Sequence, residues 1–198
     1  MFTPVCLALI VSLAAAPGNA LHNGDFTDAD ASLAAGWTLD VGIGKARAAR
    51  RETGGVDGGA YVEIAMSGNG QADVRATAGF VELQSDAAYL LTCAAKVSNV
   101  ANGSHAVELQ WFGPQGYISL DGASATVTNK WTRIAVGPVR PPDGATRAIV
   151  LLRTYHGGTY GFDDVALTTV QQMPAGVLQN GGFESDGNGD GIPDAWTL

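Results

Sequence analysis

The stretch at residues 89–97 reads Tyr-Leu-Leu-Thr-Cys-Ala-Ala-Lys-Val and alternates between two kinds of side chain. One side of the alternation is wholly apolar: Tyr89, Leu91, Cys93, Ala95 and Val97. The other side includes Thr92 and Lys96. Successive side chains of a β-strand point to opposite faces of the sheet, so this period of two predicts a half-buried strand.

The same alternation recurs along the chain. It predicts strands at 61–66, 74–83, 105–112, 131–136, 147–155 and 160–168. Turn clusters separate them, among them Ser67-Gly68-Asn69-Gly70 and Asp121-Gly122. No segment has a helical period longer than two turns. Many short antiparallel strands predict an all-β fold, an antiparallel β-sandwich of jelly-roll type, with Trp111 and Cys93 in its core.

One phrase of the sequence occurs twice. Leu21-His-Asn-Gly-Asp-Phe26 is followed by Gly36-Trp-Thr-Leu39, and Leu178-Gln-Asn-Gly-Gly-Phe183 is followed by Ala195-Trp-Thr-Leu198. Self-similarity at the distance of a whole domain indicates repeated modules. We therefore expect one module at 21–170, a linker at 171–177 and the start of a second module at 178–198, with further domains in the same chain.

The first twenty residues are uncharged and mostly apolar, and they end in Gly18-Asn19-Ala20. This segment is too short to span a bilayer comfortably and predicts a signal peptide at 1–20, hence a secreted or cell-surface protein. A buried first helix ending at Pro17-Gly18 is the alternative. No later segment predicts a membrane span.

Composition narrows the class of partner. The net charge is −8, which argues against nucleic acid, because phosphate neutralisation needs clustered Lys and Arg. Once Cys6 departs with the signal peptide, Cys93 is left alone and no intramolecular disulfide is possible, so the module depends on its hydrophobic core. The basic run from Lys45 to Arg51 is most simply a solvated strand face.

Three motifs together resemble a known family. Asn23-Gly-Asp-Phe26 with a downstream Trp, Gly59-Ala-Tyr-Val-Glu-Ile64 and Tyr160-Gly-Phe-Asp-Asp-Val-Ala-Leu167 are similar to secreted carbohydrate-binding modules of the galactose-binding-like jelly-roll superfamily. The resemblance covers roughly residues 21–170. It implies a polysaccharide or other glycan as partner.

Sugar binding needs aromatic faces that stack on sugar rings and polar groups for the hydroxyls. The candidates outside the core-facing register are Glu108, Gln110, Arg153 and Tyr155, with Tyr117 nearby. The alternative for Tyr155 is an ordinary exposed strand residue.

The C-terminal loop predicts a calcium site. Oxygen-bearing side chains stand at loop positions one, three, five and nine, a glycine stands at position six, and a carbonyl is available at seven: Asp186, Asn188, Asp190, Asp194, Gly191 and Ile192. Calcium takes about six to eight oxygen ligands, and such spacing points alternate residues inward. The twelfth position is Thr197 and no flanking helices are evident, so the loop resembles the Asp-rich loops of bacterial surface repeats. A solvated Asp/Gly linker is the alternative.

The resemblance also implies a structural calcium in the first module. Asp163 matches one family ligand, but Thr27 stands where the family has Glu; the second copy carries that residue as Glu184.

No catalytic motif is present, and the adjacent Asp163 and Asp164 face opposite ways in a strand, so they cannot flank one glycosidic bond. We expect a non-catalytic carbohydrate-binding module that attaches a larger secreted protein to polysaccharide. The alternative is a calcium-stabilised structural or adhesion repeat of a bacterial surface protein with no sugar ligand.

Overall fold

The computed structural model describes residues 18–30, 33–76, 80–84, 86–99, 103–170 and 187. Within these ranges the chain forms strands and no helix. The strands are β1 (Trp37–Arg51), β2 (Tyr61–Ala76), β3 (Val81–Glu82), β4 (Ala88–Ser98), β5 (Gly103–Gly113), β6 (Gly116–Val127), β7 (Thr132–Val139), β8 (Arg147–Thr154) and β9 (Gly158–Val170). A helix long and apolar enough to cross a membrane is not found among the described residues. Residues 1–17, the linker and, apart from Gly187, the second copy of the motif lie outside them.

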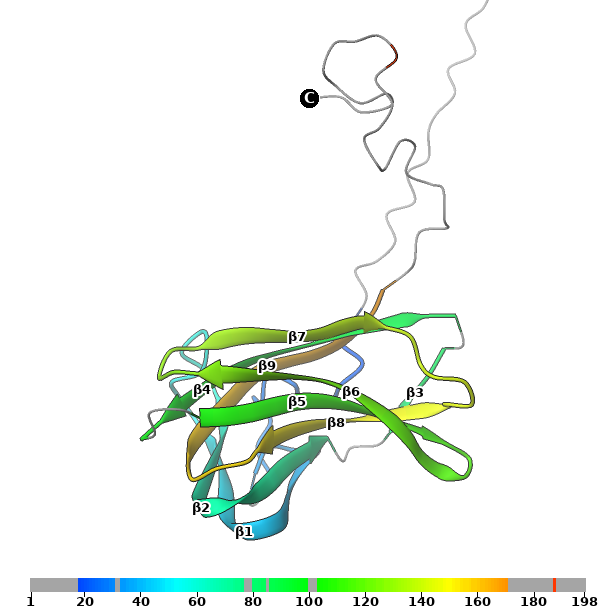
Figure 1. The fold of residues 1–198 in the computed structure, drawn as a ribbon. Helices are drawn as coiled ribbons and strands as arrows, with labels where there is room; N and C mark the ends of the chain where they lie inside the picture. Colours follow the sequence, from blue (N-terminus) through cyan, green and yellow to red (C-terminus); the bar gives the residue numbers. More distant parts are fainter. Residues whose placement is uncertain are drawn as a thin grey trace, which may run out of the picture.

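The strands form two layers that share β2. Residues 62–66 of β2 pair with β9, and residues 72–75 pair with β8. The first layer, here the β9 sheet, runs β2-β9-β4-β7, and the second, the β8 sheet, runs β2-β8-β5-β6 (Figure 1). β1 follows β2 through both layers, and every pairing is antiparallel. This confirms the predicted antiparallel β-sandwich.

The predicted turn at Ser67–Gly70 is wrong, because β2 continues through it. There β2 bends from one sheet into the other, and the register with β1 shifts twice between Val41 and Lys45. The bend needs glycine: a Cβ on Gly70 would lie 2.2 Å from the Ile43 carbonyl oxygen. Gly68 and Gly70, which predicted a turn between two strands, therefore lie at a bend within the single strand β2.

The predicted turn at Asp121-Gly122 is also wrong, because both residues lie within β6. The chain reverses earlier, between Gly113 and Gly116, where Gly116 has a φ of 113°. Asp121 accepts a hydrogen bond from the Trp111 indole at 2.6 Å, so its side chain is occupied by the neighbouring strand. Asp121 is thus accommodated within β6, because its carboxylate accepts the hydrogen bond of the buried Trp111 indole.

The core lies between the two sheets. Aromatic contacts cross it: Tyr89 of β4 is 6.1 Å from Trp111 of β5 between ring centroids, and His105 of β5 is 5.9 Å from Phe162 of β9. Trp111 and Cys93 are fully buried, as predicted. Burial raises the pKa of the Cys93 thiol, which keeps it protonated and unreactive.

The opening motif closes one end of the sandwich. Asn23 donates from its amide to the carbonyls of Asp28 and Ala35, and its own carbonyl accepts from the Trp37 indole at 3.0 Å. A Cβ on Gly24 would lie 1.9 Å from the Val165 carbonyl oxygen. Phe26 is fully buried, with its ring 5.1 Å from that of Trp37. The repeated residues Asn, Gly, Phe and Trp are therefore those that this closure requires.

Two residues that the sequence assigns to the signal peptide contact β9. The Asn19 side chain donates to the Val165 carbonyl and accepts from the Leu167 amide, each at 2.9 Å. The Ala20 amide donates to the Leu167 carbonyl at 2.8 Å. Cleavage after Ala20 stays a prediction, and it would remove these three hydrogen bonds.

His105 makes the fold sensitive to acid. It is fully buried and neither ring nitrogen has a hydrogen-bond partner among the residues that the structure describes, and desolvation lowers its pKa to about 4. In the unfolded chain the pKa of a histidine is about 6.5. Because the pKa of His105 is lower in the folded protein, the neutral ring favours folding above about pH 6.5, and the free energy of unfolding decreases as the pH falls from there toward 4.

Replacing His105 by leucine should remove this sensitivity. Between pH 7 and pH 5 the wild type should lose about 2 kcal/mol of unfolding free energy more than His105→Leu does. The variant should also be more stable at pH 7, because two unpaired buried nitrogens are gone. Urea unfolding at both pH values measures this, and equal losses in the two proteins would contradict it.

Candidate functional site

An ionic network lies on the outer face of the β8 sheet. The Arg153 guanidinium donates to both carboxylate oxygens of Asp73, from Nε at 2.7 Å and from Nη2 at 3.0 Å. Its Nη1 donates to Oε1 of Glu108 at 2.7 Å. The side chains of Asp73, Glu108 and Arg153 are only 4%, 6% and 14% exposed. These contacts further raise the pKa of Arg153, so the guanidinium stays charged.

Neutral polar groups complete the network around Glu108. The Tyr155 hydroxyl donates to Oε1 of Glu108 at 3.4 Å, and the Gln110 amide donates to Oε2 at 3.2 Å. On the other side, Arg75 forms ion pairs with Asp73 and Asp40. Charges of alternating sign therefore extend from β1 across β2 and β8 to β5.

Strand register explains why these groups meet. Arg153 stands opposite Asp73 on β2 and opposite Ala106 on β5. Because Ala106 is small, the guanidinium reaches the diagonal neighbour Glu108, a pairing that neighbouring strands permit. Gly122 stands opposite Glu108 on β6, and a Cβ there would lie 3.3 Å from Cγ of Glu108. Small residues thus leave the space that the charged side chains fill.

Four of the five residues predicted to bind ligand come together here: Glu108, Gln110, Arg153 and Tyr155. Two details differ from the expectation. Tyr155 follows the end of β8 and is half-buried, so it is not an ordinary exposed strand residue. Three of the Arg153 donor groups are engaged by carboxylates. Sequence reasoning missed Asp73, although it alternates with the buried Ala72 and Val74 and so had to face away from the core.

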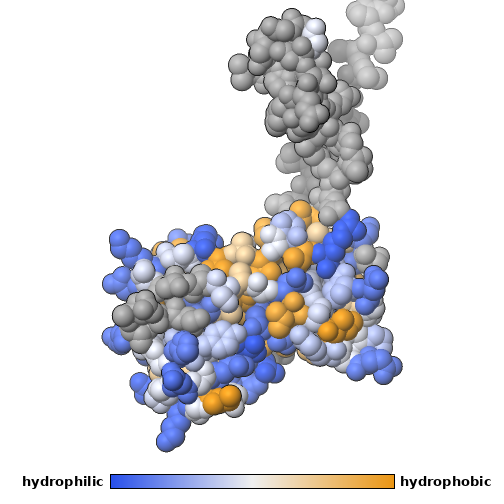
Figure 2. Space-filling model, in the orientation of Figure 1, coloured by the Kyte–Doolittle hydropathy of each residue, from blue (hydrophilic) through white to orange (hydrophobic). Residues whose placement is uncertain are grey.

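Tyr117 lies at the other end of the same sheet, in an aromatic group. Its ring is 5.8 Å from that of Phe112, which is 5.1 Å from Phe80, and Arg147 stacks 4.0 Å from the Phe80 centroid. Phe112 is four residues beyond Glu108 on β5, about 13 Å along the strand. Tyr117 is 55% exposed. Figure 2, which looks onto β5, β6 and β8, shows a mostly hydrophilic surface with separate hydrophobic side chains.

Asp163 faces a different part of the molecule. Its two carboxylate oxygens accept from the amides of Val56 and Asp164, each at 2.7 Å, and burial raises its pKa. With Asp25, Asp57 and Asp164 it lines a cavity of about 180 Å³. The sequence placed Asp163 and Asp164 on opposite faces of a strand, but both border this cavity, and the φ of 52° at Asp164 interrupts the regular strand. Among the described residues no three acidic, histidine or cysteine side chains converge to hold a metal.

Next to this cavity, the Arg50 guanidinium donates hydrogen bonds to two backbone carbonyls at the end of the opening motif. Arg50 donates from Nε to the Phe26 carbonyl at 2.5 Å and from Nη2 to the Thr27 carbonyl at 2.7 Å. Its side chain is 11% exposed. The acidic lining would suit a hard cation chemically, although the Phe26 and Thr27 carbonyls and both Asp163 oxygens already accept hydrogen bonds within the protein. Calcium at Asp163 stays a prediction, and the predicted ligands Asp186, Asn188, Asp190, Ile192 and Asp194 lie outside the described residues.

The fold is shared with known carbohydrate-binding modules. No protein-family model matches the chain, and no curated protein sequence matches it. The CBM22-1 xylan-binding domain from Paenibacillus barcinonensis Xyn10C has a TM-score of 0.61 at 14% identity, over 81% of this chain and 99% of that one. TmCBM61, solved with β-1,4-galactotriose, has a TM-score of 0.56 at 13% identity, over 77% of this chain and 99% of that one.

Enzyme structures also share the fold. The enzymatically active domain of tailspike protein 4 from bacteriophage CBA120 has a TM-score of 0.58 at 16% identity over 77% of this chain. The chain spans only about a fifth of that domain, since the match covers 21% of its length. At these identities the likeness concerns the fold.

Proposed function

We propose that residues 21–170 form a non-catalytic module that binds a β-linked polysaccharide along the outer face of the β8 sheet. The observation that carries this proposal is the buried network of Asp73, Arg153 and Glu108. Burying charges costs free energy even when they are paired, and replacing such a network by apolar residues is often neutral or stabilising. Charges kept on a face that points away from the core therefore support a role beyond stability.

The network assigns separate roles to its members. Arg153 holds Glu108 and Asp73, so it positions the polar floor. Gln110 and Tyr155, at the edge of the network, would contact the sugar: Tyr155 by its ring and Gln110 by its amide. The aromatic group of Phe80, Phe112 and Tyr117 lies farther along the same face, at a distance that a short oligosaccharide spans.

Chemical reasoning supports a binding role over a catalytic one. Glycoside hydrolysis usually needs one carboxylic acid that donates a proton and a second carboxylate. Here the Asp73 and Glu108 carboxylates both accept hydrogen bonds from one guanidinium within the protein. Neither is arranged to act as a general acid.

The repeated opening motif supports a larger context. The residues that close the sandwich at Asn23, Gly24 and Phe26 recur at Asn180, Gly181 and Phe183. We propose that the module is one of at least two in a secreted or cell-surface protein, and that the loop at 186–194 binds calcium in the second. The module would attach that larger protein to its glycan.

A structural repeat without a sugar ligand is the second candidate. One observation favours it: the carboxylates of the network are already paired within the protein. In that case the face would only stiffen the sheet.

A binding measurement separates the two candidates. Tyr155→Ala should weaken binding to an insoluble or oligomeric β-linked glycan about tenfold, because a stacking surface is lost. Tyr155→Phe, the matched control, keeps the ring and should stay within about threefold of the wild type. Affinity electrophoresis over a panel of plant, algal and microbial glycans, followed by calorimetry, measures this. Wild type that is unretarded on the whole panel would reject the binding role.

A further inference from the structure

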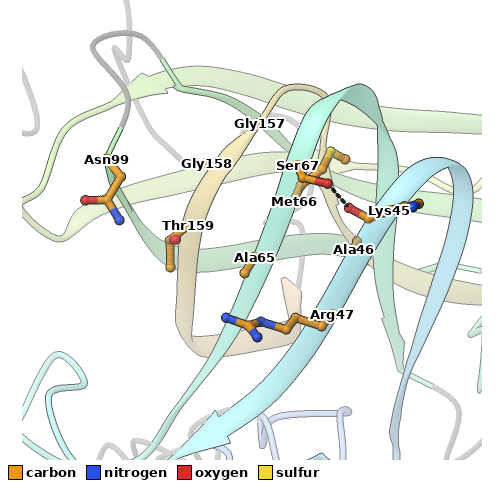
Figure 3. A pocket seen from close by; sticks show the side chains of 10 residues that line it. All are labelled: Lys45, Ala46, Arg47, Ala65, Met66, Ser67, Asn99, Gly157, Gly158 and Thr159. Atoms are coloured by element: carbon orange, nitrogen blue, oxygen red, sulfur yellow. Dashed lines mark hydrogen bonds between the residues drawn. The ribbon is translucent and has the colours of Figure 1, made fainter.

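A second cavity lies on the opposite sheet, where the bend of β2 meets the start of β9. It has a volume of about 670 Å³. Figure 3 shows Arg47 reaching from β1 across Ala65 toward Thr159, with Asn99 approaching from the other side. Ala65 alternates with the buried Ile64 and Met66, so this opening faces away from the core and belongs to the β9 sheet.

The cavity carries positive charge in an acidic chain. Arg47 lines it and Lys45 stands at its rim, where its side chain projects away from Thr159 (Figure 3). Both are exposed, and neither forms an ion pair with another residue that the structure describes. The neighbouring Arg51, by contrast, is paired with Glu63. With a net charge of −8 for the whole chain, an arginine over the cavity that has no ion pair among the described residues indicates a site for an anionic group.

The rest of the lining indicates what carries that group. Hydroxyl and amide groups come from Ser67, Asn99 and Thr159. Ala65, which stands opposite both Arg47 and Thr159, supplies a small apolar floor. The volume lies in the range of pockets for small organic ligands and exceeds what a bare anion needs. A flat ring with several hydroxyls and one negative charge matches a cationic end, a polar rim and a small apolar floor.

We propose that this cavity binds an anionic sugar residue, with its carboxylate or sulfate group against Arg47. Arg presents a planar fork of donors that matches such groups, so it fixes orientation as well as charge. The ring lies over Ala65, and Ser67, Asn99 and Thr159 meet its hydroxyls. The site does not depend on the proposed glycan face of the β8 sheet.

The test uses the full chain and two anionic probes. Trigalacturonate carries carboxylates, a sulfated galacto-oligosaccharide carries sulfate esters, and neutral galactotriose is the uncharged comparison. Backbone amide shifts in nuclear magnetic resonance locate each probe, and calorimetry gives its affinity. At least one anionic probe should shift amides at 45–47, 65–67 and 157–159, and its affinity should fall as salt rises.

Arg47→Gln should lower the affinity for that anionic probe about tenfold or more, because a charge-assisted hydrogen bond is lost. The matched control Lys130→Gln removes one exposed cation elsewhere and should leave the affinity within about twofold. Which probe binds tells whether the group is carboxylate or sulfate.

Three results would overturn the proposal. The first is that neither anionic probe shifts the cavity amides. The second is that Arg47→Gln and Lys130→Gln weaken binding equally, which would indicate bulk charge only. The third is that acetate or inorganic sulfate alone binds as tightly as the oligosaccharides. The proposed binding of neutral glycans to the outer face of the β8 sheet is tested separately. If that proposal is wrong, neutral glycans will not shift the amides around Gln110 and Tyr155.

Discussion

Replacing Arg153 by alanine is expected to lower the free energy of unfolding by about 3–5 kcal/mol, because it leaves Glu108 buried without a counter-charge and Asp73 with only its longer, 3.7 Å pair to Arg75. Asp73 and Glu108 are only 4% and 6% exposed at the side chain, so in the folded protein their hydrogen bonds come mainly from the guanidinium. Urea unfolding followed by circular dichroism at pH 7 measures the loss. Arg153→Lys should recover only part of it, since an ammonium group cannot make the two parallel hydrogen bonds to Asp73.

Arg133 offers the matched control. It pairs with Asp164 on the surface, with side-chain exposures of 62% and 46%. Exposed pairs contribute little, so Arg133→Ala should cost less than about 1 kcal/mol. Equal losses for Arg153→Ala and Arg133→Ala would show that the network is not buried as described.

Replacing Asp163 by alanine is expected to cost about 3 kcal/mol, since the amides of Val56 and Asp164 would both lose their acceptor. Asp163→Asn should lose less, because its side-chain oxygen still accepts one of the two hydrogen bonds.

The same measurement in calcium and in a chelator tests the metal. Since the Asp163 oxygens accept from amides and Arg50 donates to the Phe26 and Thr27 carbonyls, the loss should be the same in both buffers. A calcium-dependent rise in wild-type stability that Asp163→Ala abolishes would contradict this and place the ion at Asp163.

Strand alternation predicts most of the sandwich because it reports directly which side chains are buried. Residues 89–97 and 105–112 lie within β4 and β5, and Trp111 and Cys93 are buried as expected. The same parity placed Glu108 and Gln110 on the face away from the core. This alternation can be recognised without knowing which strands lie beside β5, because it depends on the sequence of one strand alone.

The errors arose where two strands decide the outcome. Gly68 and Gly70 signal a turn locally, and only the passage of β1 and β2 between the sheets makes them a bend within β2. Asp121 stands in a strand because Trp111 needs its carboxylate. Asp73 joined the candidate site through its register with Arg153, which no single segment of the sequence specifies.

The central claim is that a neutral β-linked glycan binds the outer face of the β8 sheet. An amide-shift titration of the full chain with neutral β-linked oligosaccharides, xylan- and galactan-derived among them, tests it most directly. The account predicts fast-exchange shifts confined to the segments around Glu108, Gln110 and Tyr155, extending toward Phe112 and Tyr117 with longer oligosaccharides. Shifts confined to the β9 sheet, or no shifts at millimolar concentrations of any neutral oligosaccharide, would contradict it.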